Sequence, residues 1–264
     1  MRTHLVRTAG RAMIGLVIAA QLTLAGAAGP GGTAQPVLAA SRGYSVDLAT
    51  SRDYVAQKNL VQCVGASMQM MLNIMGRSDD RSARTQLRLQ KLARGLSGPT
   101  RPGFQRQGAS VRGWMSGLNQ LDAGPYRLAG AATLAEAMRT AAMSIRLTGK
   151  PVGLLVWHGR HAWVMSGFKA TSDPLFDPTF KVTAAYILDP LYPNRSATWG
   201  PSPKPRQAVT VATVGRQFVP RGQGMWPGVI GVNPAWSLAG FSGKYVLVLP
   251  YRIEPVARLF HVAS

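Results

Sequence analysis

The chain has 264 residues, of which 46% are hydrophobic, so it can bury a substantial core and suits one large domain or two small ones. Thirty Lys and Arg residues against ten Asp and Glu residues give a formal net charge of +20. The positive residues are scattered and no nucleic-acid-binding signature accompanies them, so we expect association with polyanionic surfaces and no specific nucleic-acid partner.

The first 28 residues have the layout of a secretory signal peptide. Arg2, Arg7 and Arg11 precede an apolar run over residues 12–28, and small residues suited to cleavage follow near residues 25–27 or 38–40. We therefore predict a signal peptide at 1–28, a Gly/Pro/Ala-rich linker at 29–43 and a folded domain over 44–264. The expected location is secreted or extracytoplasmic, with no membrane span after cleavage.

Cys63 is the chain's single cysteine. An exported protein lies in a compartment where disulfides form, yet this cysteine has no partner in its own chain. It is therefore either a small buried side chain or a residue kept for its chemistry. One cysteine alone does not make a zinc site, and we expect neither a metal nor a cofactor.

The first half of the domain reads as helices. Apolar residues recur at helical spacing, and Ser110 and the pair Thr133 and Glu136 supply start signals. The expected helices are 63–75, 86–96, 110–121 and 133–146.

The second half reads as strands. Apolar runs predict strands at 152–157, 161–168, 182–188 and 245–249. A short helix is expected at 210–218, with long loops at 169–181, 192–208 and 219–243. Helices followed by consecutive strands favour an α+β domain with N-terminal helices packed on an antiparallel sheet.

A set of chemically suited residues lies on these elements. Cys63 opens a predicted helix, where free backbone N–H groups and the helix dipole favour the thiolate. His161 opens a strand and can act as a base, while Asp189 ends the next strand and can orient an imidazole. Gln57 precedes Cys63 by six residues, so its amide can share an oxyanion hole with the Cys63 N–H.

The segment QKNLVQCVGASMQMMLNIMG resembles the nucleophile segment of the peptidase family C thirty-nine-like group, within the papain-like cysteine peptidase superfamily that includes the bacteriocin leader peptidases. HAWVMSGF resembles the group's histidine strand, and ILDP its Asp-Pro. The resemblance spans about residues 54–190. It implies a papain-like fold and cleavage of peptide bonds by a Cys-His-Asp mechanism with Gln57 in the oxyanion hole.

Several alternatives remain open. His158 competes with His161 as the base, and Asp173 or Asp177 competes with Asp189 because the loop between the strands is long. Val64-Gly65 stands where the group often has Gly-Pro. Trp226 and Trp236 are candidates for a cleft wall formed by the C-terminal third, which would set specificity without supplying a chemical group.

Two function classes fit these observations. The first is an exported cysteine peptidase that acts on a peptide or protein, with cleavage of cell-envelope material as a variant. The second is a catalytically inactive papain-like binding module that holds an anionic envelope component or a peptide. The sequence leaves the oligomeric state open.

Overall fold

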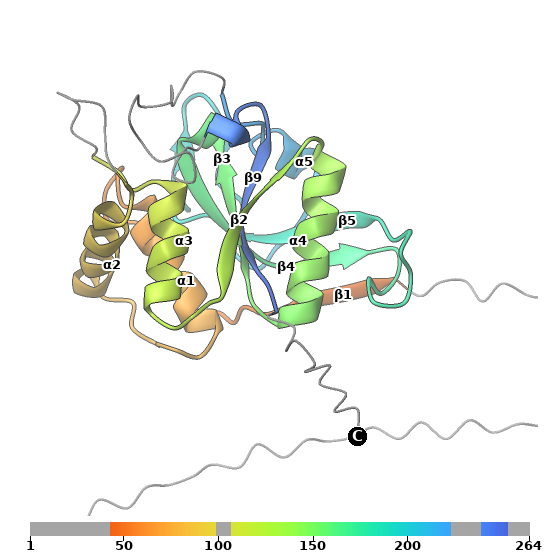
Figure 1. Cartoon of the computed structure of the whole chain (residues 1–264), viewed down its shortest axis with the longest axis horizontal. Helices are drawn as coiled ribbons and strands as arrows, with labels where there is room; N and C mark the ends of the chain where they lie inside the picture. The colour runs from red at the N-terminus through yellow and green to blue at the C-terminus, as the bar shows by residue number, and fades with distance from the viewer. Residues whose placement is uncertain (1–42, 99–106, 223–238, 253–264) are drawn as a thin grey trace, which may run out of the picture. The chain divides into compact units, whose positions relative to one another are not determined.

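The computed structural model describes residues 43–98, 107–222 and 239–252. The chain divides into two compact units, residues 1–40 and 41–264, and every described residue belongs to the second. Figure 1 shows this unit as a set of helices around a sheet. The expected signal peptide, most of the expected linker, Trp226 and Trp236 lie outside the described residues.

Three of the long helices, α2, α3 and α4, begin at a residue whose side chain caps the helix. Ser82, Ser110 and Thr133 accept hydrogen bonds from backbone N–H groups of the first turns of α2, α3 and α4. Gly149, in the left-handed conformation at φ 65°, ends α4. The helices are α1 (Cys63–Ile74), α2 (Ala83–Gly95), α3 (Val111–Gln120), α4 (Leu134–Thr148) and the short α5 (Val211–Gly215).

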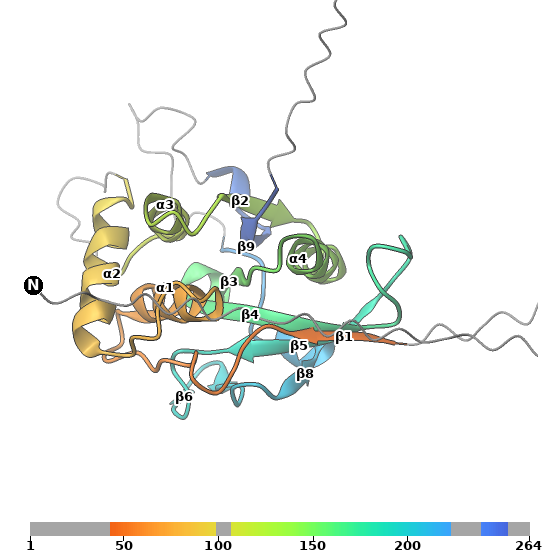
Figure 2. The ribbon, with the colours of Figure 1, turned by 90° about the horizontal axis from the view of Figure 1, so that it is seen from below.

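The main sheet is antiparallel throughout and has the order β2-β9-β3-β4-β5-β8, with β1 also paired to β4. Figure 2 shows β1, β4 and β5 running side by side. The strands are β1 (Tyr44–Asp47), β2 (Tyr126–Ala131), β3 (Val152–Val156), β4 (His161–Ala170), β5 (Val182–Leu188), β8 (Ala208–Thr210) and β9 (Tyr245–Pro250). A separate small hairpin pairs β6 (Arg195–Ser196) with β7 (Gly200–Pro201).

The central strands β3 and β4 are buried along almost their whole length because both of their faces are covered. Ala162 and Val164 of β4 belong to a core with α1, α2 and α3, whereas Trp163 and Met165 belong to a second core with α4. This alternation is the two-residue period of a strand. The described fold is therefore a mixture of helices and an antiparallel sheet, as expected, but the helices cover both faces of the sheet.

Four helices and four of the main-sheet strands match the predicted segments closely. Half of the capping box at Thr133 forms, since the Glu136 N–H donates to Thr133 Oγ1 at 3.1 Å. The Glu136 carboxylate accepts from the N–H of Ala132 at 2.8 Å instead of that of Thr133. Strands β1, β2 and β8 were not predicted, and β9 lies between β2 and β3. The expectation that sheet neighbours are consecutive in the chain is wrong at this position.

Helices α2 and α3 approach each other so closely that only glycine fits at position 113. A Cβ on Gly113 would lie 1.9 Å from the Ala93 carbonyl oxygen and 2.6 Å from Ser97 Oγ. We expect Gly113→Ala to lower the free energy of unfolding by about 3 kcal/mol, since the backbone must shift. Gly95→Ala is the matched control, because its Cβ would meet no atom within 4 Å. Denaturant unfolding measures both, and equal stabilities would contradict this packing.

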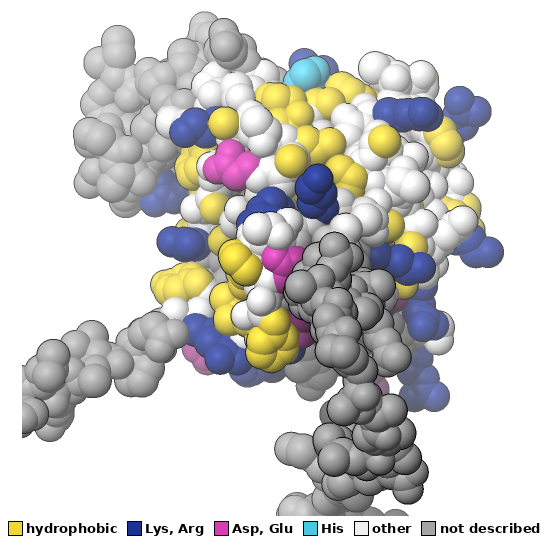
Figure 3. Space-filling view, turned by 90° about the vertical axis from the view of Figure 1, so that its right-hand side faces the viewer, with side chains coloured by type: hydrophobic (Ala, Val, Ile, Leu, Met, Phe, Trp, Pro, Cys, Tyr) yellow, Lys and Arg dark blue, Asp and Glu magenta, His cyan; other side chains and the backbone are white. Residues whose placement is uncertain are grey.

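The surface of the described unit is strongly basic. Figure 3 shows Lys and Arg side chains dispersed over one face, with few acidic side chains between them. Among residues 43–98, 107–222 and 239–252, no helix is both long enough and apolar enough to cross a membrane.

Candidate active site

Cys63 is the first residue of α1 and is partly buried. One turn further along the helix, Ser67 Oγ donates to the carbonyl of Ala162 at 3.3 Å. Ala162 follows His161 in β4. This bond therefore ties the start of α1 to the start of β4, next to the histidine.

His161 and Asp189 form a buried pair. Nε2 of His161 lies 2.7 Å from Oδ1 of Asp189, and the two side chains are 4% and 0% exposed. The same Oδ1 also accepts from the N–H of Leu191 at 2.8 Å. Because Nε2 faces the carboxylate, the other ring nitrogen, Nδ1, is the one left to face Cys63, which raises the pKa of His161 through hydrogen bonding and charge.

The pKa of His161 is set by opposing effects. Burial disfavours the imidazolium and lowers the pKa, whereas the hydrogen bonds to Asp189 and Cys63 and the charges of both groups raise it. The raising effects prevail and bring the pKa to about 9. The site therefore favours a protonated imidazole between two acidic groups at neutral pH.

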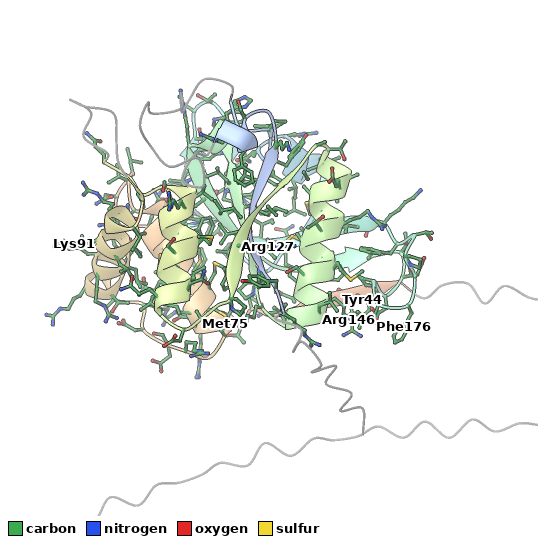
Figure 4. All side chains as sticks on the ribbon, viewed as in Figure 1. Tyr44, Met75, Lys91, Arg127, Arg146 and Phe176 are labelled. Carbon is green, nitrogen blue, oxygen red and sulfur yellow. The ribbon has the colours of Figure 1, made fainter. Side chains whose placement is uncertain are left out.

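The alternative residues lie elsewhere. His158 is exposed, and its Nδ1 lies 2.7 Å from the carbonyl oxygen of Pro220. Asp173 pairs with Arg146 at 2.9 Å, and Arg146 in turn lies over the ring of Tyr44. Figure 4 labels Arg146 and Tyr44 close to each other. Asp177 accepts from Ser172 and Thr179. Of the three candidate carboxylates, Asp189 is the one hydrogen-bonded to His161.

Gln57 lies beside the turn that follows Asp189. Its backbone N–H donates to the carbonyl of Pro190 at 2.8 Å. Its side-chain Nε2 donates to the carbonyl of Asn59 at 2.9 Å, while Oε1 is buried without a partner among the described residues. One of the two amide hydrogens is therefore engaged by the chain's own backbone.

Two glutamines of α2 hold the segment that leads to Cys63, and the sequence analysis did not predict this role. Gln86 accepts from the N–H of Lys58 at 2.8 Å and donates to the carbonyl of Ala56 at 3.0 Å, so it brackets Gln57. Gln90 donates to the carbonyl of Val61 at 2.7 Å and accepts from the N–H of Gly65 at 2.8 Å, so it brackets Cys63.

Both glutamines are almost fully buried, at 0% and 3% exposure. Their spacing of four residues places them on one helical face, and this polar pair among apolar neighbours is the signal that could have identified them.

Replacing Gln90 with Leu is expected to lower the free energy of unfolding by about 2 kcal/mol, because the Val61 carbonyl and the Gly65 N–H would be buried without partners. Gln120→Leu, at an exposed position, is the matched control. Chemical denaturation measures both variants. A Gln90→Leu protein as stable as the control would show that these bonds do not hold the segment.

An aromatic wall lies beside the histidine. The ring of Trp157 stacks on the imidazole of His161, with centroids 4.1 Å apart and an angle of 18° between planes. Trp199 lies parallel to Trp157, at 6.4 Å. A cavity of about 350 Å³ opens between these indoles and the residues His158, Arg160, Thr198 and Gly222.

Within the described part of the chain, no three His, Cys, Asp or Glu side chains gather in a way that could hold a metal ion.

No protein-family model matches the sequence. No curated protein matches it either. A comparison of structures finds similarity to the crystal structure of a double glycine motif protease from an AMS/PCAT transporter in complex with the leader peptide. The two chains are 16% identical, with a TM-score of 0.32, over 62% of this chain and 83% of that chain.

Proposed function

We propose that this protein is an exported cysteine peptidase of papain-like fold, with Cys63 as nucleophile and His161 as general acid and base. Asp189 orients the imidazole, and Gln57 with the Cys63 N–H stabilises the oxyanion. The substrate is a peptide or protein, with cell-envelope peptides as a variant. Export rests on the signal-like composition of residues 1–28.

One observation carries the proposal, namely the buried hydrogen bond between His161 and Asp189 beside Cys63, whose thiol acts on the pKa of His161. A thiol needs a base to become a strong nucleophile, and the base needs a fixed orientation. Most histidines in proteins do not stand between a helix-terminal cysteine and a fully buried carboxylate. A raised imidazolium pKa favours transfer of the thiol proton to the ring.

The proposed reaction has two stages. In the first, the Cys63 thiolate attacks the peptide carbonyl carbon, and the negative oxygen is held by the Cys63 N–H and the remaining Gln57 amide hydrogen. The His161 imidazolium then gives its proton to the departing amine, which leaves a thioester on Cys63. In the second, neutral His161 takes a proton from water, the hydroxide attacks the thioester, and the acid product leaves as the thiolate returns.

The binding module is the second candidate, and the net charge of +20 favours it. A basic surface attracts anionic polymers without any chemistry at Cys63. In that case the thiol would be an ordinary side chain. Reactivity at Cys63 therefore separates the two classes.

The test is turnover of a mixture of peptides, read by mass spectrometry, with the wild-type protein and with Cys63→Ser. We expect wild type to release defined fragments and Cys63→Ser to release none, while both keep the same circular dichroism spectrum. Equal fragment yields from the two proteins would assign the cleavage to a contaminant. Polyanion binding by a folded wild-type protein that cleaves no peptide would favour the binding module.

A further inference from the structure

The Trp157 indole is held in place by one residue of the C-terminal third. Its backbone N–H donates to the carbonyl of Gln217 at 3.0 Å, and its indole Nε1 donates to Gln217 Oε1 at 2.9 Å. The amide of Gln217 also donates to the carbonyl of Pro201 at 3.0 Å. A single glutamine thus fixes both the backbone and the ring of Trp157.

The Gln217 side chain is itself fixed. It is 7% exposed and follows α5, between Val214 and Phe218, which are 1% and 0% exposed in the core under α4. Two hydrogen bonds made by the side-chain amide, together with the hydrogen bond to the Gln217 backbone carbonyl, leave this amide little freedom to rotate.

Trp157 has an unusual backbone. Both Trp157 and His158 have φ of 57°. For any residue other than glycine this left-handed conformation is unfavourable, and it persists where surrounding contacts impose it. The contacts to Gln217 supply that constraint. The result of the strained turn is that the indole lies flat on the His161 ring.

We propose that Gln217 is a positioning residue, which clamps Trp157 against the face of His161 and so keeps both ring nitrogens aligned with Asp189 and Cys63. This inference rests on the proposed role of His161. The two nitrogens of the His161 ring each need a fixed direction for hydrogen bonding. The indole packed on one face of the ring restricts its tilt and so helps to keep these directions. The indole also keeps water from that face of the imidazole and attracts its positive form.

The sequence predicted that the C-terminal third sets specificity and supplies no chemical group. The proposed role of Gln217 adds a second task for this third, namely to position the histidine. Gln217 lies 56 residues after His161 and outside the span of the family resemblance. Its proposed effect passes through Trp157 and involves no contact with substrate.

The test is the titration of His161 by NMR in protein labelled at histidine carbons, with its signal assigned by its absence from the spectrum of His161→Gln. The chain has four histidines, so few signals overlap. The variants are Gln217→Leu and Trp157→Phe, which keeps a ring but lacks the N–H, and their double variant. Gln207→Leu, at an exposed position, is the matched control.

We expect Gln217→Leu and Trp157→Phe each to move the His161 titration by at least one pH unit, from about 9 towards 6.5, since alignment with Asp189 and Cys63 is lost. Cys63 alkylation by iodoacetamide at pH 6 should fall about tenfold. The double variant should shift the titration little further than either single variant, because both substitutions break the same bond between the indole and Gln217. The control should match wild type.

A His161 titration and a Cys63 rate within twofold of wild type in folded Gln217→Leu would overturn the inference. If that variant does not fold, an unchanged titration in Trp157→Phe overturns it equally. A wild-type Cys63 no faster than a free thiol would count against the peptidase, while the histidine titration would still decide the role of Gln217.

Discussion

Replacing His161 with Gln should lower peptide turnover roughly 10⁴-fold, because the nucleophile loses its base and the leaving amine loses its acid. The substitution keeps a side chain that can hydrogen bond, so the buried Asp189 carboxylate retains a donor. The loss should appear in kcat, with little change in KM. Alkylation of Cys63 at pH 6, which needs no substrate, should fall in parallel.

His158→Gln is the matched control for this result. It is the same substitution three residues away, at an exposed side chain that contacts the Pro220 carbonyl. It should keep turnover within about threefold of wild type, since the His158 ring bonds to the Pro220 carbonyl and supplies no hydrogen bond to the His161–Asp189 pair. Equal losses in the two variants, or a His161→Gln protein within tenfold of wild type, would contradict the assignment of the base.

Asp189→Asn is expected to lower turnover on the order of 10³- to 10⁴-fold while leaving the size of the side chain unchanged. The neutral amide removes the charge that faces Nε2, so the pKa of His161 should fall from about 9 towards its ordinary value of 6.5. The imidazolium then no longer favours the thiolate. Asp173→Asn is the control, because it breaks the Arg146 pair without touching the site.

The same substitution should change how stability depends on pH. The folded-state pKa of His161 lies above the unfolded value, so the pair stabilises the fold fully below pH 6.5 and loses this contribution as pH rises through about 9. The wild-type free energy of unfolding should therefore fall across this window. In Asp189→Asn the fall should flatten, and denaturant titrations at pH 6, 7.5 and 9 measure it. A parallel fall in both proteins would contradict the pairing.

Local signals explain why much of the fold could be predicted. Ser110 and Thr133 mark helix starts through short-range bonds, and the apolar runs of β3 and β4 are long enough to be strands. Strands β1 and β2 could not be predicted from the sequence, because their burial patterns are mixed and they pair with distant strands, β4 and β9. No local pattern reports a pairing made more than a hundred residues away.

The candidate site divides in the same way. Cys63, His161 and Asp189 stand at the ends of recognisable elements, where a chemically suited residue is conspicuous. Gln86, Gln90 and Gln217 act through bonds to residues distant in the chain, which the sequence does not report, and the four-residue spacing of Gln86 and Gln90 was the local sign of that pair. Trp157 stacks on His161 only because the chain turns through positive φ, which the sequence WHG did not indicate.

The pH dependence of Cys63 alkylation tests the central claim most directly. Cys63 is the single cysteine, so every alkylated thiol reports this site. A free cysteine ionises near pH 8.5 and is less than about 1% thiolate at pH 6. The proposed site predicts a second-order rate constant with iodoacetamide at pH 6 at least about tenfold above that of a cysteine peptide. A rate that follows the free thiol at every pH, or no reaction in the folded protein, would contradict it.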